Sequence, residues 1–102
     1  MDIEDLRKFI VVAQYENLNK ASQHLSVTTG ALSKVVKRIE HKLEVQVFDR
    51  VGKHIRLNQR GNKFLLYATH LVHEADQALS EFRGSTAVYN VTVAGPSLLL
   101  QY

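Results

Sequence analysis

Apolar residues recur along the first part of the chain at the spacing of amphipathic helices. Positions 3, 6, 9, 10 and 13 are apolar, so a helix is expected over residues 3–15, with Asp2 as its N-cap. The segment "ENLN" interrupts this pattern. A short second helix is then expected over residues 20–25, with Asn19 as its cap, and "SVT" forms the turn that follows it.

A third helix is expected over residues 29–43, with Thr28 as its cap and two chemically different faces. At about 100° per residue, one face gathers apolar side chains: Leu32, Val35, Val36, Ile39 and Leu43. The other face gathers small and cationic residues: Gly30, Ser33, Lys34, Lys37 and His41. This face suits a DNA major groove, because small residues let the backbone approach base edges and lysines reach phosphates or guanine. A solvated helix with ordinary lysines gives the same pattern, so this face alone leaves both interpretations open.

A β-hairpin is expected in "VQVFDRVGKHIRLN". Apolar and polar residues alternate on both sides of "VGK", with the apolar positions at Val45, Val47, Ile55 and Leu57. The tip and second arm are basic and carry Lys53, His54 and Arg56. Two helices joined by a short turn predict a helix-turn-helix, and a basic hairpin directly after it is placed as a wing that contacts DNA backbone or minor groove. Closure of a small hydrophobic core is the structural alternative for the hairpin.

One long helix is expected from residue 59 to about residue 82, with Asn58 as its cap. Its apolar positions form two seams whose combined face is too wide to be buried by a domain of about 60 residues. Pairing with the same helix of a second chain would cover that face, and folding back onto its own domain is the alternative. The predicted dimer interface comprises Phe64, Ala68, Leu71, Val72, Ala75, Ala78, Leu79 and Phe82.

Charge is segregated along the chain. Residues 28–60 contain eight lysines and arginines and three acidic residues, whereas the whole chain carries a net charge of only +3. A local cationic excess favours a nucleic-acid-binding face over a generally basic protein. The chain has no cysteine, which excludes disulfides and thiol chemistry, and its apolar run "FIVVA" is too short to span a membrane.

No arrangement of residues indicates an enzyme. His70 and His73 are three residues apart, but no third ligand or HExxH motif accompanies them, so no metal site is expected. The glycines form no phosphate-binding loop, and no spacing of serine, histidine and acidic residues marks a nucleophile. No catalytic residue and no cofactor is therefore expected.

Three stretches of the chain follow one known pattern: "LRKFIVVAQYENLNKAS", "HLSVTTGALSKVVKRIEHKLEVQVFDR" and "GKHIRLNQRG". In these stretches, and over about residues 3–83, the chain resembles the N-terminal part of LysR-type transcriptional regulators. It implies a mainly α fold, a winged helix-turn-helix with a three-helix core and a hairpin wing, followed by a long dimerisation helix. The implied domains are a DNA-binding domain over 1–58, a linker helix over 59–83, and the hinge and first strand of a truncated effector-binding domain over 84–102.

The resemblance also implies a function and the residues that carry it. A bacterial cytoplasmic regulator is expected, which binds double-stranded DNA at an interrupted inverted repeat as a homodimer. Full-length members of the family often assemble into tetramers. A small-molecule effector would bind only the missing domain. By position, the base-reading residues are Thr28, Thr29, Gly30, Ser33 and Lys34; the backbone-contacting residues are Lys37, Arg38 and Arg50; and the wing residues are Lys53, His54 and Arg56.

Two departures from the family pattern change what can be carried over. The family usually has glutamine, then proline or serine, where Thr29 and Gly30 stand; glutamine binds adenine in bidentate fashion and threonine cannot. Glu44 replaces a helix-ending glycine, and a left-handed backbone there would cost roughly 1–2 kcal/mol.

A different class of function is a helical interaction or dimerisation module without an operator of its own, such as a truncated regulator that acts through heterodimers. The basic wing argues against this alternative. A DNA regulator of another winged-helix family would keep the function but place the dimer interface away from residues 59–83.

Overall fold

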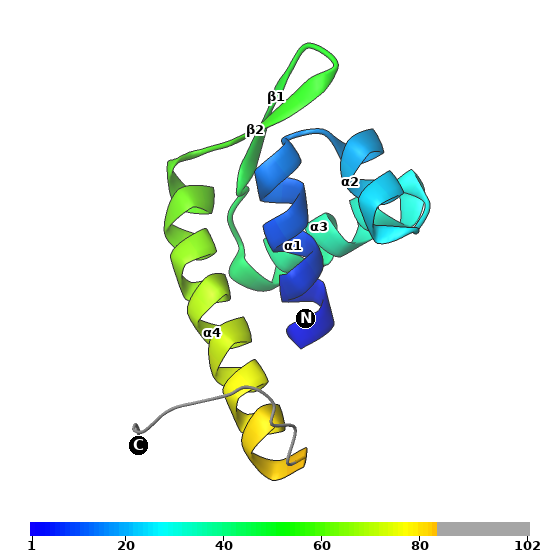
Figure 1. The fold of residues 1–102 in the computed structure, drawn as a ribbon. Helices are drawn as coiled ribbons and strands as arrows, with labels where there is room; N and C mark the ends of the chain where they lie inside the picture. The colour runs from blue at the N-terminus through cyan, green and yellow to red at the C-terminus, as the bar shows by residue number, and fades with distance from the viewer. Residues whose placement is uncertain (84–102) are drawn as a thin grey trace. The chain divides into compact units, whose positions relative to one another are not determined.

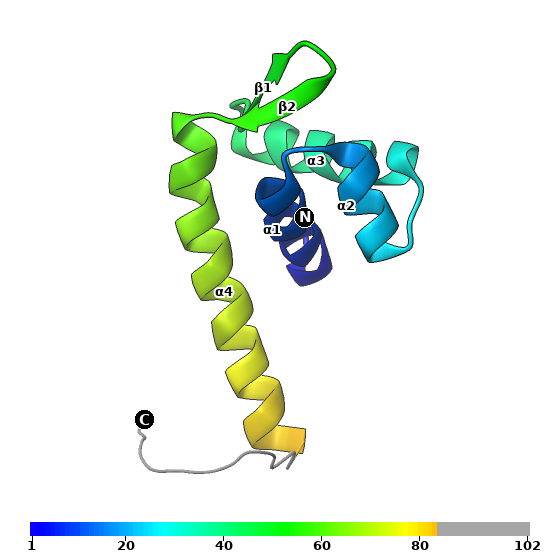
Figure 2. The same cartoon turned by 45° about the horizontal axis from the view of Figure 1, so that its top comes forward.

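The computed structural model describes residues 1–83. The elements are α1 (Ile3–Tyr15), α2 (Leu18–Leu25), α3 (Thr29–Leu43), β1 (Phe48–Val51), β2 (His54–Leu57) and α4 (Gln59–Arg83). The first three helices lie together, and the antiparallel hairpin of β1 and β2 extends beyond them (Figures 1 and 2). This order confirms the expected winged helix-turn-helix followed by a long helix. The hinge and first strand expected over 84–102 lie outside the described residues.

The hydrophobic core lies where α1, α3 and the hairpin meet. Its largest fully buried side chains are Phe9, Leu32, Ile39, Val12 and Val47. The ring centroid of Phe9 lies 5.6 Å from that of Phe48 and 5.1 Å from that of Phe64. Burial of an aromatic side chain contributes roughly 1.5–3 kcal/mol, so Phe9 fastens α1 to both the hairpin and the start of α4.

Polar side chains cap the helices and fix where they begin. The Asp2 and Thr28 caps expected from the sequence are present, and each accepts a hydrogen bond from a first-turn backbone N–H. The expected start of the second helix is wrong, because Asn17 rather than Asn19 is the cap and accepts from the backbone N–H of Lys20 at 2.9 Å. The helix begins at Leu18 instead of residue 20, since Leu18 packs against the core.

Three helices end at residues with a left-handed backbone, and none of the three is glycine. The φ angles are 49° at Glu16, 57° at Ser26 and 60° at Glu44. The conditional expectation for Glu44 is thus met. The Glu16 carboxylate also accepts a hydrogen bond of 2.7 Å from the backbone N–H of Leu57, which ties the end of α1 to β2.

The hairpin begins later than its sequence pattern predicts. Val45 and Val47 precede β1 and do not form its alternating arm; the strands pair Phe48 with Leu57 at one end and Val51 with His54 at the other. The segment before β1 is bonded to α3 instead, because the Glu40 carboxylate accepts from the backbone N–H groups of Val47, at 2.9 Å, and Phe48, at 3.4 Å.

Asn58 is the single residue between β2 and α4, and it is bonded in several directions. Its side-chain oxygen accepts from the backbone N–H of Gly61 at 2.8 Å, which confirms its predicted role as the cap of α4. Its side-chain nitrogen donates to the carbonyl of Gln46 at 3.0 Å and to the carboxylate of Asp49 at 3.2 Å. A Cβ at Gly61 would collide with the carbonyl of Val47, so glycine permits the close approach of α4 to the hairpin.

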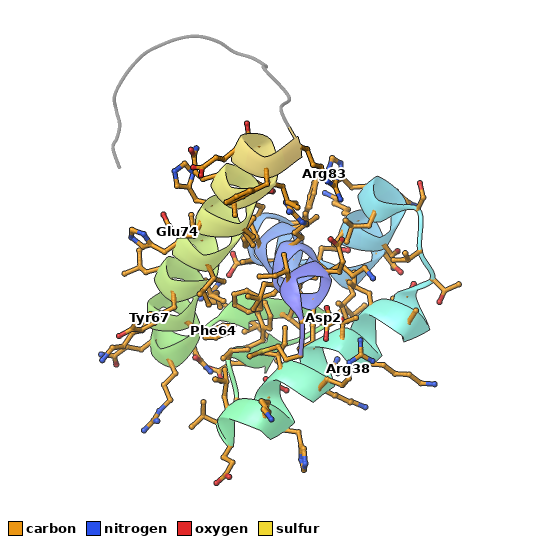
Figure 3. All side chains as sticks on the ribbon, turned by 90° about the horizontal axis from the view of Figure 1, so that it is seen from below. Asp2, Arg38, Phe64, Tyr67, Glu74 and Arg83 are labelled. Atoms are coloured by element: carbon orange, nitrogen blue, oxygen red, sulfur yellow. The ribbon has the colours of Figure 1, made fainter. Side chains whose placement is uncertain are left out.

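The chain divides within α4 into two units, with the boundary between residues 72 and 73. In the first unit α4 folds back onto its own domain: Ala68 is fully buried, and Phe64 and Val72 are partly buried against the core. Ala68 is therefore wrong as a dimer contact, because the core already covers it. Phe64 points inward and Tyr67 outward (Figure 3), and Leu71 is about half exposed. The division expected between residues 58 and 59 stays a prediction.

Candidate nucleic-acid interface

The first turn of α3 is fixed by two threonine hydroxyls that the sequence assigns to base reading. The Thr28 oxygen accepts from the backbone N–H of Ala31 at 3.0 Å, and the Thr29 hydroxyl donates to the side-chain oxygen of Asn19 at 3.2 Å. Both residues are exposed. Their hydrogen bonds anchor the turn between α2 and α3, so they position the start of α3 as well as presenting hydroxyls to solvent.

Gly30 and the residues that follow it form an open face of α3. A Cβ at Gly30 would meet no atom within 4 Å, and the backbone there is not left-handed, so the fold itself does not require glycine. Ser33 is half-buried and Lys34 is exposed one turn further along. The missing side chain at Gly30 therefore leaves space for a ligand rather than for packing.

Arg38 has a partner that the sequence patterns do not indicate. Its guanidinium donates to both oxygens of the Asp5 carboxylate, at 2.9 and 3.2 Å, and Asp5 is only 4% exposed. These hydrogen bonds hold the pKa of Asp5 below its usual value, against the opposing effect of burial, and raise the pKa of Arg38. The Arg38 side chain is still 54% exposed, so it joins α3 to α1 and also faces solvent.

The hairpin presents four basic residues, all of them exposed. Arg50 lies on β1, Lys53 in the turn, and His54 and Arg56 on β2. The Nδ1 atom of His54 lies 3.3 Å from the Asn17 side-chain nitrogen, which brings the base of the wing to the start of α2. Arg50, Lys53 and Arg56 thus extend the cationic surface from α3 along the wing.

The structure brings the predicted backbone-contacting residues together. Ser33, Lys37 and Arg50 line one pocket between α3 and β1. Lys37 also lines an adjoining groove on α3, with Lys34, Arg38, His41 and Lys42. Lys53, His54 and Arg56 line neither hollow. Lys42 was not among the predicted contacts, although its spacing of four residues from Arg38 and eight from Lys34 places it on the same helical stripe.

Such a surface attracts polyanions. Its cations lie on exposed positions, whereas the nearby carboxylates of Asp5, Glu40 and Asp49 are engaged in hydrogen bonds within the protein. Within residues 1–83, no group of three histidine or acidic side chains could hold a metal ion, and no helix is long and apolar enough to cross a membrane. Lysine and arginine beside an open helix start suit phosphates and base edges.

Known proteins share this fold and sequence pattern. The family model described as "Bacterial regulatory helix-turn-helix protein, lysR family" matches residues 3–62. The chain is 29% identical over 85 residues to the HTH-type transcriptional regulator DgdR of Burkholderia cepacia, covering 83% of this chain and 29% of that protein. It is 36% identical over 83 residues to the uncharacterized HTH-type transcriptional regulator YybE of Bacillus subtilis (strain 168), covering 81% of this chain and 28% of that protein. The chain thus spans less than a third of the length of these relatives.

Solved structures agree with this similarity. The BenM_DBD/benA site 1 DNA complex superposes with a TM-score of 0.76 at 26% identity, covering 82% of this chain and 98% of that chain. The CbnR_DBD–DNA complex superposes with a TM-score of 0.78 at 26% identity, covering 83% of this chain and 98% of that chain. In both cases the matching protein was crystallised with DNA.

Proposed function

The chain belongs to the LysR family of bacterial regulatory helix-turn-helix proteins, and from this premise we propose that it binds an interrupted inverted repeat in double-stranded DNA as a homodimer. Two α3 helices would enter successive major grooves, and the wings would contact the flanking backbone. Thr28, Thr29, Gly30, Ser33 and Lys34 would read bases. Lys37, Arg38 and Arg50 would bind phosphates, together with Lys53, His54 and Arg56 on the wing.

The observation that carries this proposal is the joint placement of α3 and the wing. The open, basic face of α3 and the basic hairpin lie next to each other, and Lys37 and Arg50 from these two elements line one pocket. Solved proteins with this fold were crystallised with DNA. The same support makes regulation in the bacterial cytoplasm the setting we propose, without catalytic activity or a cofactor for DNA binding.

Dimerisation through α4 is part of the proposal. In the first unit, Leu66, Tyr67 and Leu71 are exposed apolar side chains on α4, and in the second unit Leu79 and Phe82 are exposed. Charge favours an antiparallel pair. The start of α4 carries Arg60 and Lys63, and its later part carries Glu74, Asp76 and Glu81. Antiparallel helices would set these opposite charges beside each other. Tetramers and effector sensing would belong to a longer protein.

Selection from a randomised duplex library by the purified 102-residue chain, at two salt concentrations, tests this function. We expect enrichment of an inverted repeat. With roughly 6–10 neutralised phosphates, its affinity would fall about 10³–10⁵-fold between 50 and 200 mM salt. Salt-sensitive retention without an enriched motif would contradict base reading by this chain. Dimerisation without retention on any duplex would instead favour an interaction module.

A further inference from the structure

The pocket between α3 and β1 has the lining and the charge of a seat for one phosphate group. We propose that Lys37 and Arg50 bind the same phosphodiester of the DNA backbone there, so that the recognition helix and the wing grip one phosphate jointly. This inference rests on the proposed DNA-binding function and specifies how two of its contacts are coupled.

The two elements contribute matching sides of the pocket. On α3, Ser33, Val36 and Lys37 share one helical stripe that faces the hairpin. On the hairpin, Arg50 follows Phe48 by two residues, so both lie on the same face of β1, and Ile55 pairs with Arg50 across the ladder. The pocket encloses about 170 Å³. Besides Ser33, Lys37 and Arg50, its lining includes the apolar residues Leu18, Val36, Phe48 and Ile55 and the polar residues Glu40 and Gln46.

The charges in the pocket select a monoanion. Within the described residues, neither Lys37 nor Arg50 has a hydrogen-bond or ion-pair partner. The pocket's carboxylate, Glu40, accepts from the backbone N–H groups that precede and begin β1. Two cations and one carboxylate leave a formal charge of one positive unit. A phosphodiester carries one negative charge and would neutralise it, whereas free phosphate is partly dianionic at pH 7 and would exceed it.

A shared phosphate would couple the two cations. Both side chains are exposed in the free protein, so solvent screens their charges from each other. A phosphate between them would accept a charge-assisted hydrogen bond from each. Removal of either cation would therefore weaken the contribution of that one phosphate to binding, and removal of both would abolish it.

Methylphosphonate substitution tests whether the phosphate is shared. The probe is the duplex enriched in the library selection. Each modified duplex carries a neutral methylphosphonate at one backbone position of a half-site and at the symmetry-related position of the other half-site. We expect the unmodified chain to lose affinity at several positions. Lys37→Ala and Arg50→Ala should each lose part of their sensitivity at the same position, and the double variant should lose all of it there. Lys42→Ala, which removes a neighbouring cation outside this pocket, should keep its full sensitivity at that position.

Salt dependence gives a second readout. If one phosphate is shared, the Lys37→Ala/Arg50→Ala double variant should lower the slope of log K against log salt by about 0.9 per subunit, and two separate phosphates would lower it by about 1.8. Reduced sensitivity of the two single variants at different positions would overturn the shared phosphate and leave the proposed function standing. Saturable binding of inorganic phosphate to Lys37 and Arg50, seen by NMR and competing with the duplex, would overturn the phosphodiester assignment. No binding to any duplex would refute the proposed function itself.

Discussion

Two glutamates with a left-handed backbone conformation allow a matched test of the hydrogen bond that joins the wing to α1. Glu16 and Glu44 both end a helix in the left-handed region, at φ 49° and 60°. Only the Glu16 carboxylate is used elsewhere, accepting from the half-buried backbone N–H of Leu57 at 2.7 Å. The side chain of Glu44 makes no hydrogen bond within residues 1–83. Glycine at each position therefore relieves similar strain but removes a tertiary hydrogen bond only at Glu16.

The expected effects have opposite signs. A left-handed non-glycine residue costs roughly 1–2 kcal/mol, and glycine removes this strain. Glycine also raises the entropy of the unfolded chain, which offsets about 0.5–1 kcal/mol of that gain. Glu44→Gly should thus stabilise the fold by about 0.5–1 kcal/mol. A hydrogen bond to a charged group contributes about 1.5–3 kcal/mol, so Glu16→Gly should be destabilising despite the relief of strain. The difference between the two variants measures that hydrogen bond, because strain and entropy cancel.

Urea unfolding followed by circular dichroism, at one fixed protein concentration, gives both free energies of unfolding. Glu16→Gln keeps the backbone conformation and a neutral acceptor, and its stability should lie between those of the parent and Glu16→Gly. If both glycine variants gained equal stability, the bond between Glu16 and Leu57 would contribute nothing and the reasoning would be wrong. A loss at Glu44 as large as that at Glu16 would equally contradict it.

Three further predictions concern packing, pH and DNA. Gly61→Ala should destabilise the fold by at least about 1–3 kcal/mol in urea unfolding, because the added Cβ would collide with the backbone of Val47. Gly30→Ala should stabilise the fold by up to about 1 kcal/mol, because its Cβ would meet no atom, and it should weaken duplex binding measured by fluorescence anisotropy. The pKa of Asp5 is lowered on folding, so its ionised carboxylate contributes fully to the free energy of unfolding above about pH 4. That contribution is lost as the pH falls through the pKa of Asp5 in the folded protein, and melting curves of Asp5→Asn should show a flatter pH dependence in this range. Lys34→Ala should change base preference in binding to matched and scrambled duplexes, whereas Arg50→Ala should weaken all sequences alike; equal losses of specificity would contradict this division.

Local patterns in the sequence predict most of the fold. The caps at Asp2, Thr28 and Asn58 and the apolar face of α3 each depend on residues within one or two turns, and the structure has them in place. The left-handed backbone at Glu44 was expected only through the family resemblance, in which a glycine ends this helix.

The errors arose where distant contacts decide. Asn17 rather than Asn19 caps α2 because Leu18 is drawn into a core formed by other elements. Ala68 has the spacing of a dimer seam, but its own domain covers it, and periodicity cannot tell one apolar partner from another. The pair of Asp5 and Arg38 spans 33 residues, so no local pattern indicates it. The shared pocket of Lys37 and Arg50 likewise depends on how the hairpin docks on α3.

The single-residue joint between β2 and α4 has a mechanical consequence. Asn58 donates its backbone N–H to the carbonyl of Val47 at 3.1 Å, and its side chain holds the segment before β1, the strand itself and the first turn of α4. Because the connection is one residue long and its backbone and side chain are both hydrogen-bonded, it cannot act as a hinge. A torque applied to the start of α4 would therefore be transmitted to the wing as a rigid rotation. In the proposed dimer, the angle between the two wings would follow the angle between the first turns of the two α4 helices.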